Sequence, residues 1–178
     1  QHAEPVASEL RCHRLPLLLG IPRQLQPHEQ VDVAEESIEI RGLTLTATPS
    51  QHFSGRVGNR NKTLWASFVI ATANHRVFFS GDTALTPEFE QVRDKFAPFD
   101  LVMLEVGGFH PSWDHVHLGP DNALEALRML GGGPFMPVHW GTFNLALHAW
   151  DYPAERLHEQ KVELLMPQLG APFEPAHG

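Results

Sequence analysis

The sequence of 178 residues lacks several features that would narrow its interpretation at once. It has a single cysteine, Cys12, which excludes an internal disulfide and, without a Cys-x-x-Cys pair, also excludes a thiolate-rich zinc cluster. Any bound metal must therefore be held by nitrogen and oxygen ligands. Long apolar runs are also missing, since the run over residues 15–21 is interrupted by Pro16 and Gly20 and is far shorter than the roughly 20 residues that span a bilayer. We expect no transmembrane segment.

Basic residues are few, and the start of the chain carries no visible leader. With 13 Lys and Arg against 21 Asp and Glu, the formal net charge is -8 at pH 7. Because counterion release from a polyanion cannot drive binding to such a chain, we expect no nucleic-acid partner. The chain starts at Gln1 rather than at a methionine, and no signal-peptide pattern follows, so an N-terminal targeting segment is not observable. We expect a cytoplasmic or membrane-peripheral protein.

The pattern of apolar residues predicts an α/β fold after a loop-rich start. Residues 1–30 contain four Pro and three His with little periodicity, and they are interpreted as a connector. Alternating residues predict one hairpin over 31–49, with its turn at Arg41 and Gly42, and a second hairpin from strands 64–72 and 75–82. Apolar spacing predicts helices over 87–96, 120–130 and 153–160, the first capped by Thr86, and strands over 101–106, 135–138 and 162–166. The expected architecture is a mixed sheet with flanking helices.

Three residues that commonly bind metals each follow an apolar strand, in a chain that contains 12 His. They are His52 after a Thr-rich strand, Asp82 after Phe-Phe-Ser-Gly, and His139 after Phe-Met-Pro-Val. Taken singly, each has an ordinary explanation: a loop histidine, an Asp that supports a turn or caps a helix, and a hydrogen-bonded core histidine. Taken together, the three strand ends are better explained by one shared metal site.

Five segments occur in a fixed order between residues 43 and 147: TPSQHFSGR, NRNKTLWASFVI, FFSGDT, APFDL and PVHWGTF. In residue type, order and spacing these segments resemble the metallo-β-lactamase superfamily. The branch that they resemble most is that of the N-acylphosphatidylethanolamine-hydrolysing phospholipase D-like proteins.

The resemblance implies a hydrolase with two zinc ions. It implies that His52 is a ligand of one zinc and His139 a ligand of the other, and that Asp82 bridges the two. It also implies that His117, in the segment DHVHLGP, lies beside the metals and either donates a proton to the leaving group or orients a phosphate. We therefore expect Asp82 and His117 to act in catalysis, in which a zinc-activated hydroxide cleaves a phosphodiester of a phospholipid-like substrate.

One motif of that family, His-x-His-x-Asp-His, is absent from this chain. Without it, two protein ligands remain for each zinc, fewer than the three or four that zinc sites normally use, so we expect a partial site. We interpret residues 31–178 as the C-terminal half of an αβ/βα sandwich that is truncated relative to the family, and residues 1–30 as a connector left from the missing N-terminal half. An exposed apolar sheet face is then expected, and a complementing N-terminal half is the kind of partner that would cover it.

Two other functions stay open on the sequence alone. The same fold would serve a lactonase-type hydrolase that acts on a small sugar phosphate or another ester, and it would serve a non-catalytic fragment that binds another chain. Four aromatic residues also allow two interpretations, either lining an acyl-chain pocket or packing in the core. They are Trp65, Trp113, Trp140 and Phe143.

Overall fold

The computed structural model describes residues 36–53, 65–113, 115–143, 146–166, 168 and 170–172. The predicted connector, residues 1–30, lies outside the described residues. All helices and strands named below belong to one compact unit of the chain. Within the described ranges, no helix is long and apolar enough to cross a membrane.

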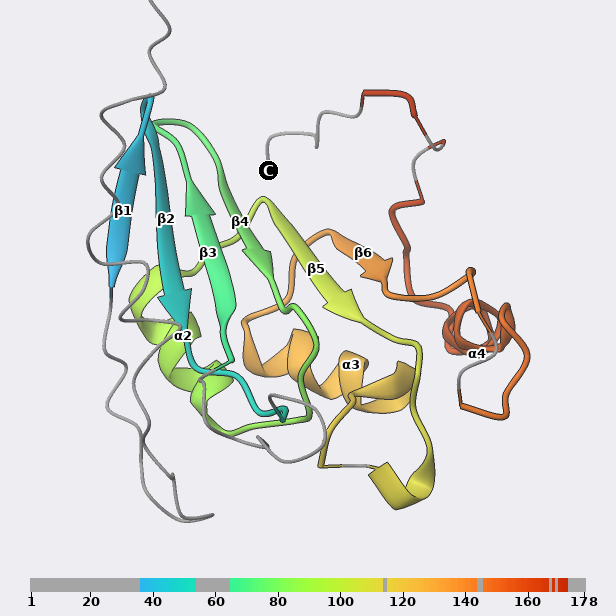
Figure 1. The fold of residues 1–178 in the computed structure, drawn as a ribbon. Coiled ribbons are helices and arrows are strands. Elements are labelled where there is room, and N and C mark those ends of the chain that lie inside the picture. The colour runs from blue at the N-terminus through green and yellow to red at the C-terminus, as the bar shows by residue number, and fades with distance from the viewer. Residues whose placement is uncertain are drawn as a thin grey trace, which may run out of the picture. The chain divides into compact units, whose positions relative to one another are not determined.

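In the described part of the chain, six strands form one mixed sheet in which their spatial order equals their order in the sequence (Figure 1). The antiparallel part consists of β1 (Ser37–Ile40), β2 (Leu43–Thr48), β3 (Ser67–Ala71) and β4 (Arg76–Phe79). The parallel part adds β5 (Leu101–Glu105) to β4, and then β6 (Phe135–Val138) to β5. The predicted α/β class and mixed sheet are confirmed.

Both predicted hairpins are present. Between β1 and β2, Arg41 and Gly42 have φ angles of 52° and 81°, and this pair of positive values is typical of the type I′ turn that suits the twist of paired strands. Between β3 and β4, the N–H of Thr72 donates to the carbonyl of His75 over 2.8 Å and closes the turn. The short polar segments between apolar runs therefore predicted the antiparallel half of the sheet correctly.

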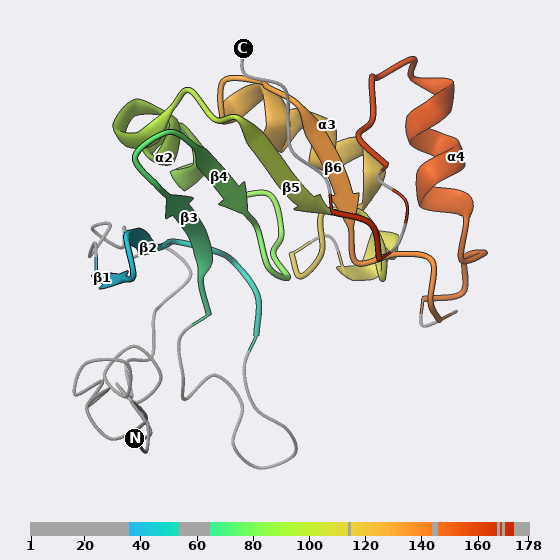
Figure 2. The same ribbon diagram turned by 90° about the horizontal axis from the view of Figure 1, so that it is seen from above.

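Two of the predicted helices connect the parallel strands, and all three lie within one residue of their predicted bounds. Helix α2 (Glu88–Phe96) joins β4 to β5, and α3 (Gly119–Met129) joins β5 to β6, as parallel pairing requires. Figure 2 shows α2 and α3 on the same face of the sheet, with α4 (Tyr152–Glu159) beside α3. The N-cap of α2 is Pro87 rather than the predicted Thr86, because the hydroxyl of Thr86 contacts the carboxylate of Glu88 instead of a backbone N–H.

The strand predicted over residues 162–166 is wrong. Only Leu164 pairs there, as an isolated parallel bridge with Phe135, and Met166 is 54% exposed. An apolar composition alone does not form a strand, because each further residue must also find a backbone partner.

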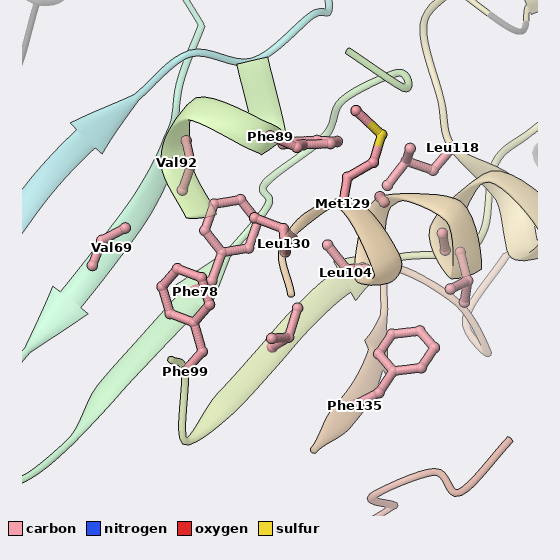
Figure 3. Packing of buried hydrophobic residues seen from close by; sticks show 14 of the residues in the cluster. Val69, Phe78, Phe89, Val92, Phe99, Leu104, Leu118, Met129, Leu130 and Phe135 are labelled. Atoms are coloured by element: carbon pink, nitrogen blue, oxygen red, sulfur yellow. The ribbon is translucent and has the colours of Figure 1, made fainter. Parts of the chain in front are cut away.

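The hydrophobic core lies between the sheet and the two helices on its face (Figure 3). Phe78 of β4 stands at its centre, with ring centroids 5.9 Å from Phe89 and 5.7 Å from Phe99. On the opposite face of the sheet, the alternating apolar side chains are partly exposed. They include Phe68, Ile70, Val77 and Phe79.

Replacing Phe78 by alanine tests the position of this core. Phe78 has no exposed surface, so truncation leaves a cavity, and we expect the free energy of unfolding to fall by about 3–5 kcal/mol in urea denaturation followed by circular dichroism. The control is Phe143→Ala, at a residue that is 72% exposed, with an expected change below about 0.5 kcal/mol. Equal losses in the two variants would contradict the assignment of the core.

Candidate metal centre

The candidate residues lie at one edge of the sheet because of how the strands run. Strands β4, β5 and β6 are parallel, and β2 runs in the same direction as β4 because both are antiparallel to β3. The loops that follow the carboxyl ends of these four strands therefore meet at the same edge, where α/β proteins commonly bind ligands. These loops contain His52, Asp82 and His139.

Asp82 and His139 approach each other across this edge. The Nε2 atom of His139 lies 3.7 Å from an oxygen of Asp82, and the two side chains are 35% and 47% exposed. His139 has a φ of 61°, a value that non-glycine residues rarely adopt and that marks local strain of order 1–3 kcal/mol. Such strain is often found at functional sites, where the position of a side chain matters more than the backbone energy.

Among the described residues, three hydrogen bonds tie the loop that contains His52 to the loop that contains Asp82, and in one of them the hydroxyl of Ser50 donates to the carbonyl of Asp82 over 3.3 Å. The N–H of Gln51 donates to the hydroxyl of Thr83 over 2.9 Å, and the N–H of Ala84 donates to the carbonyl of Gln51 over 2.6 Å. Thr83 has no exposed surface. The residues next to His52 and Asp82 in sequence are therefore hydrogen-bonded to each other.

His117 lies between the other two candidate histidines. Its ring centroid is 5.4 Å from that of His139, with the rings nearly parallel at 18°, and 5.1 Å from that of His52, edge to face. The structure thus brings the four residues predicted from the sequence into one neighbourhood.

A fifth residue, Glu105, belongs to this neighbourhood and was not predicted. It is the last residue of β5 and has no exposed surface. One of its oxygens lies 2.8 Å from Nδ1 of His117 and 3.2 Å from Nδ1 of His139. Within the described residues, Glu105, His117 and His139 offer ligand atoms that all lie within 4.8 Å of one another.

The charges of this cluster stabilise one another. Burial by itself would raise the pKa of Glu105, but hydrogen bonds with His117 and His139 outweigh burial and hold the pKa of this carboxyl below its usual value. The hydrogen bond with Glu105 raises the pKa of His139 against the effect of burial, and the charge of Asp82 raises it further. Glu105 is therefore an anion in the folded protein.

The donor set suits a zinc ion. Neutral imidazole nitrogens and carboxylate oxygens are ordinary zinc ligands, and the partial exposure of Asp82 and His139 leaves their outer atoms accessible to an ion. The chemistry and exposure of this pair therefore fit a metal.

A cavity of about 380 Å³ opens beside His139. Its walls carry the aromatic side chains of Trp140, Phe143 and Trp150 beside the polar ones of His139, Thr142 and His148, and among the described residues they include no Lys, Arg, Asp or Glu. Two of the four aromatic residues left open by the sequence, Trp140 and Phe143, therefore line a cavity next to a candidate ligand. Of the other two, Trp65 donates from its indole nitrogen to the carbonyl of Ser50 over 2.6 Å, and Trp113 is 43% exposed.

Comparison with known proteins assigns the family. Residues 5–140 match the beta-lactamase superfamily domain, and the chain belongs to this superfamily. A crystal structure of isothiocyanate hydrolase from Delia radicum gut bacteria is similar in fold, with a TM-score of 0.60 and 20% sequence identity over 83% of this chain and 61% of that one.

Two relatives are considerably longer than the part of them that matches this chain. It is 43% identical to an uncharacterized protein of Mycobacterium tuberculosis over 125 residues. This match covers 68% of this chain and 34% of the relative. It is 32% identical to the N-acyl-phosphatidylethanolamine-hydrolyzing phospholipase D 1 of Caenorhabditis elegans over 108 residues. This second match covers 58% of this chain and 30% of the relative. The chain thus spans about a third of the length of these relatives.

Replacing Gly107 by alanine tests how closely the two loops must approach at the site. A Cβ at Gly107 would stand 2.0 Å from the carbonyl oxygen of His139, so the backbone must move, and we expect a loss of about 3 kcal/mol or more in the free energy of unfolding. In NMR spectra of the folded fraction, the imidazole signals of His139 should shift.

The matched control is Gly42→Ala, where nothing lies within 4 Å and only the positive φ is unfavourable. We expect it to cost about 1 kcal/mol and to leave the signals of His139 unchanged. An effect of Gly107→Ala no larger than that of the control would show that the loops do not approach as described.

Proposed function

We propose that this chain supplies part of the active site of a metal-dependent hydrolase whose substrate is a phosphodiester with a lipid-like apolar group. The observation that carries the proposal is the meeting of Asp82, His117 and His139 at the carboxyl edge of the sheet in a member of the beta-lactamase superfamily. Residues 31–178 would form the C-terminal half of the catalytic domain.

His52, Asp82 and His139 would hold the metal centre, with Asp82 shared between two zinc ions. When bound, zinc supplies a hydroxide near neutral pH and positive charge that stabilises a phosphoryl oxygen. Two protein ligands for each ion are too few for tight binding, so a complementing N-terminal half would provide the others. Asp82 is 47% exposed, so its carboxylate is accessible to a metal ion.

His117 would act on the substrate rather than on the metal. Its side chain is 14% exposed, and its ring is stacked on that of the candidate ligand His139. A histidine in this position would orient the phosphate or hold a proton near the leaving oxygen. Asp82 and His117 are therefore the proposed catalytic residues.

The cavity beside His139 supports the apolar part of the proposed substrate. Three aromatic side chains offer apolar surface to an acyl chain, and the described part of the walls contains no Lys or Arg that would bind the phosphate of a sugar phosphate. The name of the phospholipase D relative specifies a phospholipid substrate of this kind. The proposal includes a cytoplasmic or membrane-peripheral location, where such a substrate would be met, and no nucleic-acid partner.

Zinc titration of the purified chain tests the metal centre. With a chromogenic chelator as competitor, we expect the wild type to bind zinc and the variants His139→Ala and Asp82→Asn each to raise the dissociation constant at least about tenfold, because each removes a ligand. The control is His158→Ala, at an exposed position of α4. A wild type without affinity for zinc, or variants that bind like the control, would contradict the proposed ligands.

Substrate profiling tests the apolar group. In p-nitrophenyl phosphodiesters, lengthening the second ester group from methyl to dodecyl should raise kcat/KM at least about tenfold for the zinc-loaded chain joined to a complementing N-terminal half, since each buried methylene contributes about 0.8 kcal/mol. Trp150→Ala should reduce this advantage, whereas Trp113→Ala, outside the cavity, should preserve it.

Two results would oppose this substrate. Equal kcat/KM values for the methyl and dodecyl esters would contradict a substrate with a lipid-like apolar group. Hydrolysis of lactones with no action on phosphodiesters would favour the lactonase-type alternative.

A further inference from the structure

The buried carboxylate of Glu105 is surrounded by hydrogen-bond donors. One oxygen accepts from the backbone N–H groups of Thr83 and Leu118, at 3.0 and 3.1 Å. The other lies 2.8 Å from Nδ1 of His117 and 3.2 Å from Nδ1 of His139. A fully buried carboxylate is rare in proteins and persists only where several such donors compensate for the loss of water.

This arrangement dictates which nitrogen of each imidazole carries hydrogen. An ionised carboxylate can only accept, so each Nδ1 that contacts it must be the donor. In a neutral imidazole the other nitrogen, Nε2, then has the free electron pair. In His139 this Nε2 is the atom that faces Asp82, at 3.7 Å.

We propose that Glu105 is a positioning residue that holds both His117 and His139 as Nδ1–H tautomers and so directs the two Nε2 electron pairs into the site. His139 is thereby prepared to bind a metal through Nε2, and His117 presents Nε2 to whatever lies beside that metal. The effect on metal binding rests on the proposed function, whereas the tautomers do not depend on it.

The alternative role for Glu105, as a metal ligand itself, fits the contacts less well. Its side chain has no exposed surface, and both of its oxygens already have donors beside them: the N–H groups of Thr83 and Leu118 at one, and the Nδ1 atoms of His117 and His139 at the other. Asp82, which is 47% exposed, has no such constraint. The two carboxylates thus have different tasks: Asp82 faces the ion, and Glu105 supports the histidines from behind.

Glu105 also connects these histidines to the loop of Asp82. Its own N–H donates to the hydroxyl of Ser80 over 3.0 Å, and its carboxylate accepts from the N–H of Thr83. These two residues flank Asp82 in the chain. Substitution of Glu105 would therefore disturb all the candidate groups at this edge through one side chain.

The test is the tautomeric state of the two imidazoles in the metal-free chain. Two-bond ¹H–¹⁵N correlation spectra with labelled histidine distinguish Nδ1–H from Nε2–H, and loss of signals in His117→Gln and His139→Gln assigns them. At an alkaline pH, where both rings are neutral, we expect the Nδ1–H form for both in the wild type. An Nε2–H form of either ring in the wild type would overturn the proposal without any variant of Glu105.

The variant Glu105→Gln keeps the shape of the side chain but offers both a donor and an acceptor. We expect a mixture of tautomers for at least one ring and zinc binding about 10–100-fold weaker than in the wild type, the usual effect of removing a carboxylate behind a histidine ligand. Glu125→Gln, at an exposed carboxylate of α3, should leave both measurements unchanged.

The outcomes separate this proposal from the proposed metal centre. Unchanged tautomers and unchanged zinc affinity in Glu105→Gln would overturn the positioning role and leave the metal centre intact. The expected tautomers in a wild type that binds no zinc would instead retain the positioning role and count against the metal centre.

Discussion

A carboxylate without exposed surface stays ionised only where enough donors replace the water it has lost, and at the end of β5 this condition organises the whole edge of the sheet. The carboxylate of Glu105 accepts hydrogen bonds from the backbone N–H groups of Thr83 and Leu118. It also contacts the imidazoles of His117 and His139. Removing the charge would leave several buried donors unsatisfied at once. The candidate site therefore depends on this one anion more than on any contact between the candidate ligands themselves.

The topology of the sheet explains why the anion can collect groups from distant parts of the chain. Because β4, β5 and β6 are parallel and adjacent, their carboxyl ends lie side by side, so that Asp82 after β4, Glu105 at the end of β5 and His139 after β6 meet at one edge. The large apolar side chains between the sheet and α2 and α3 hold these strands in register. Packing on one face thus fixes the relative positions of polar groups at one edge, as in many α/β proteins.

Much of this arrangement could be predicted from the sequence, since strands and helices followed from apolar spacing and His52, Asp82 and His139 each follow an apolar strand. Glu105 could not be found in this way, because it ends the apolar run Leu-Val-Met-Leu-Glu and its partners come from three other segments. The one sequence feature that pointed to Glu105 was its charge, since the rest of the strand is apolar and was expected to be buried. Two predictions were wrong: Thr86 as a helix cap and a strand over 162–166. Local composition does not reveal which partner a polar side chain or a backbone group will find.

At this edge of the sheet, imidazole nitrogen and carboxylate oxygen are the proposed ligands of a metal ion. X-ray absorption spectroscopy at the zinc edge of the zinc-loaded chain tests this proposal most directly. We predict a first shell of nitrogen and oxygen at about 2.0–2.2 Å with the outer scattering that imidazole rings produce. A shell without imidazole scattering, or one with sulfur at about 2.3 Å, would contradict this account.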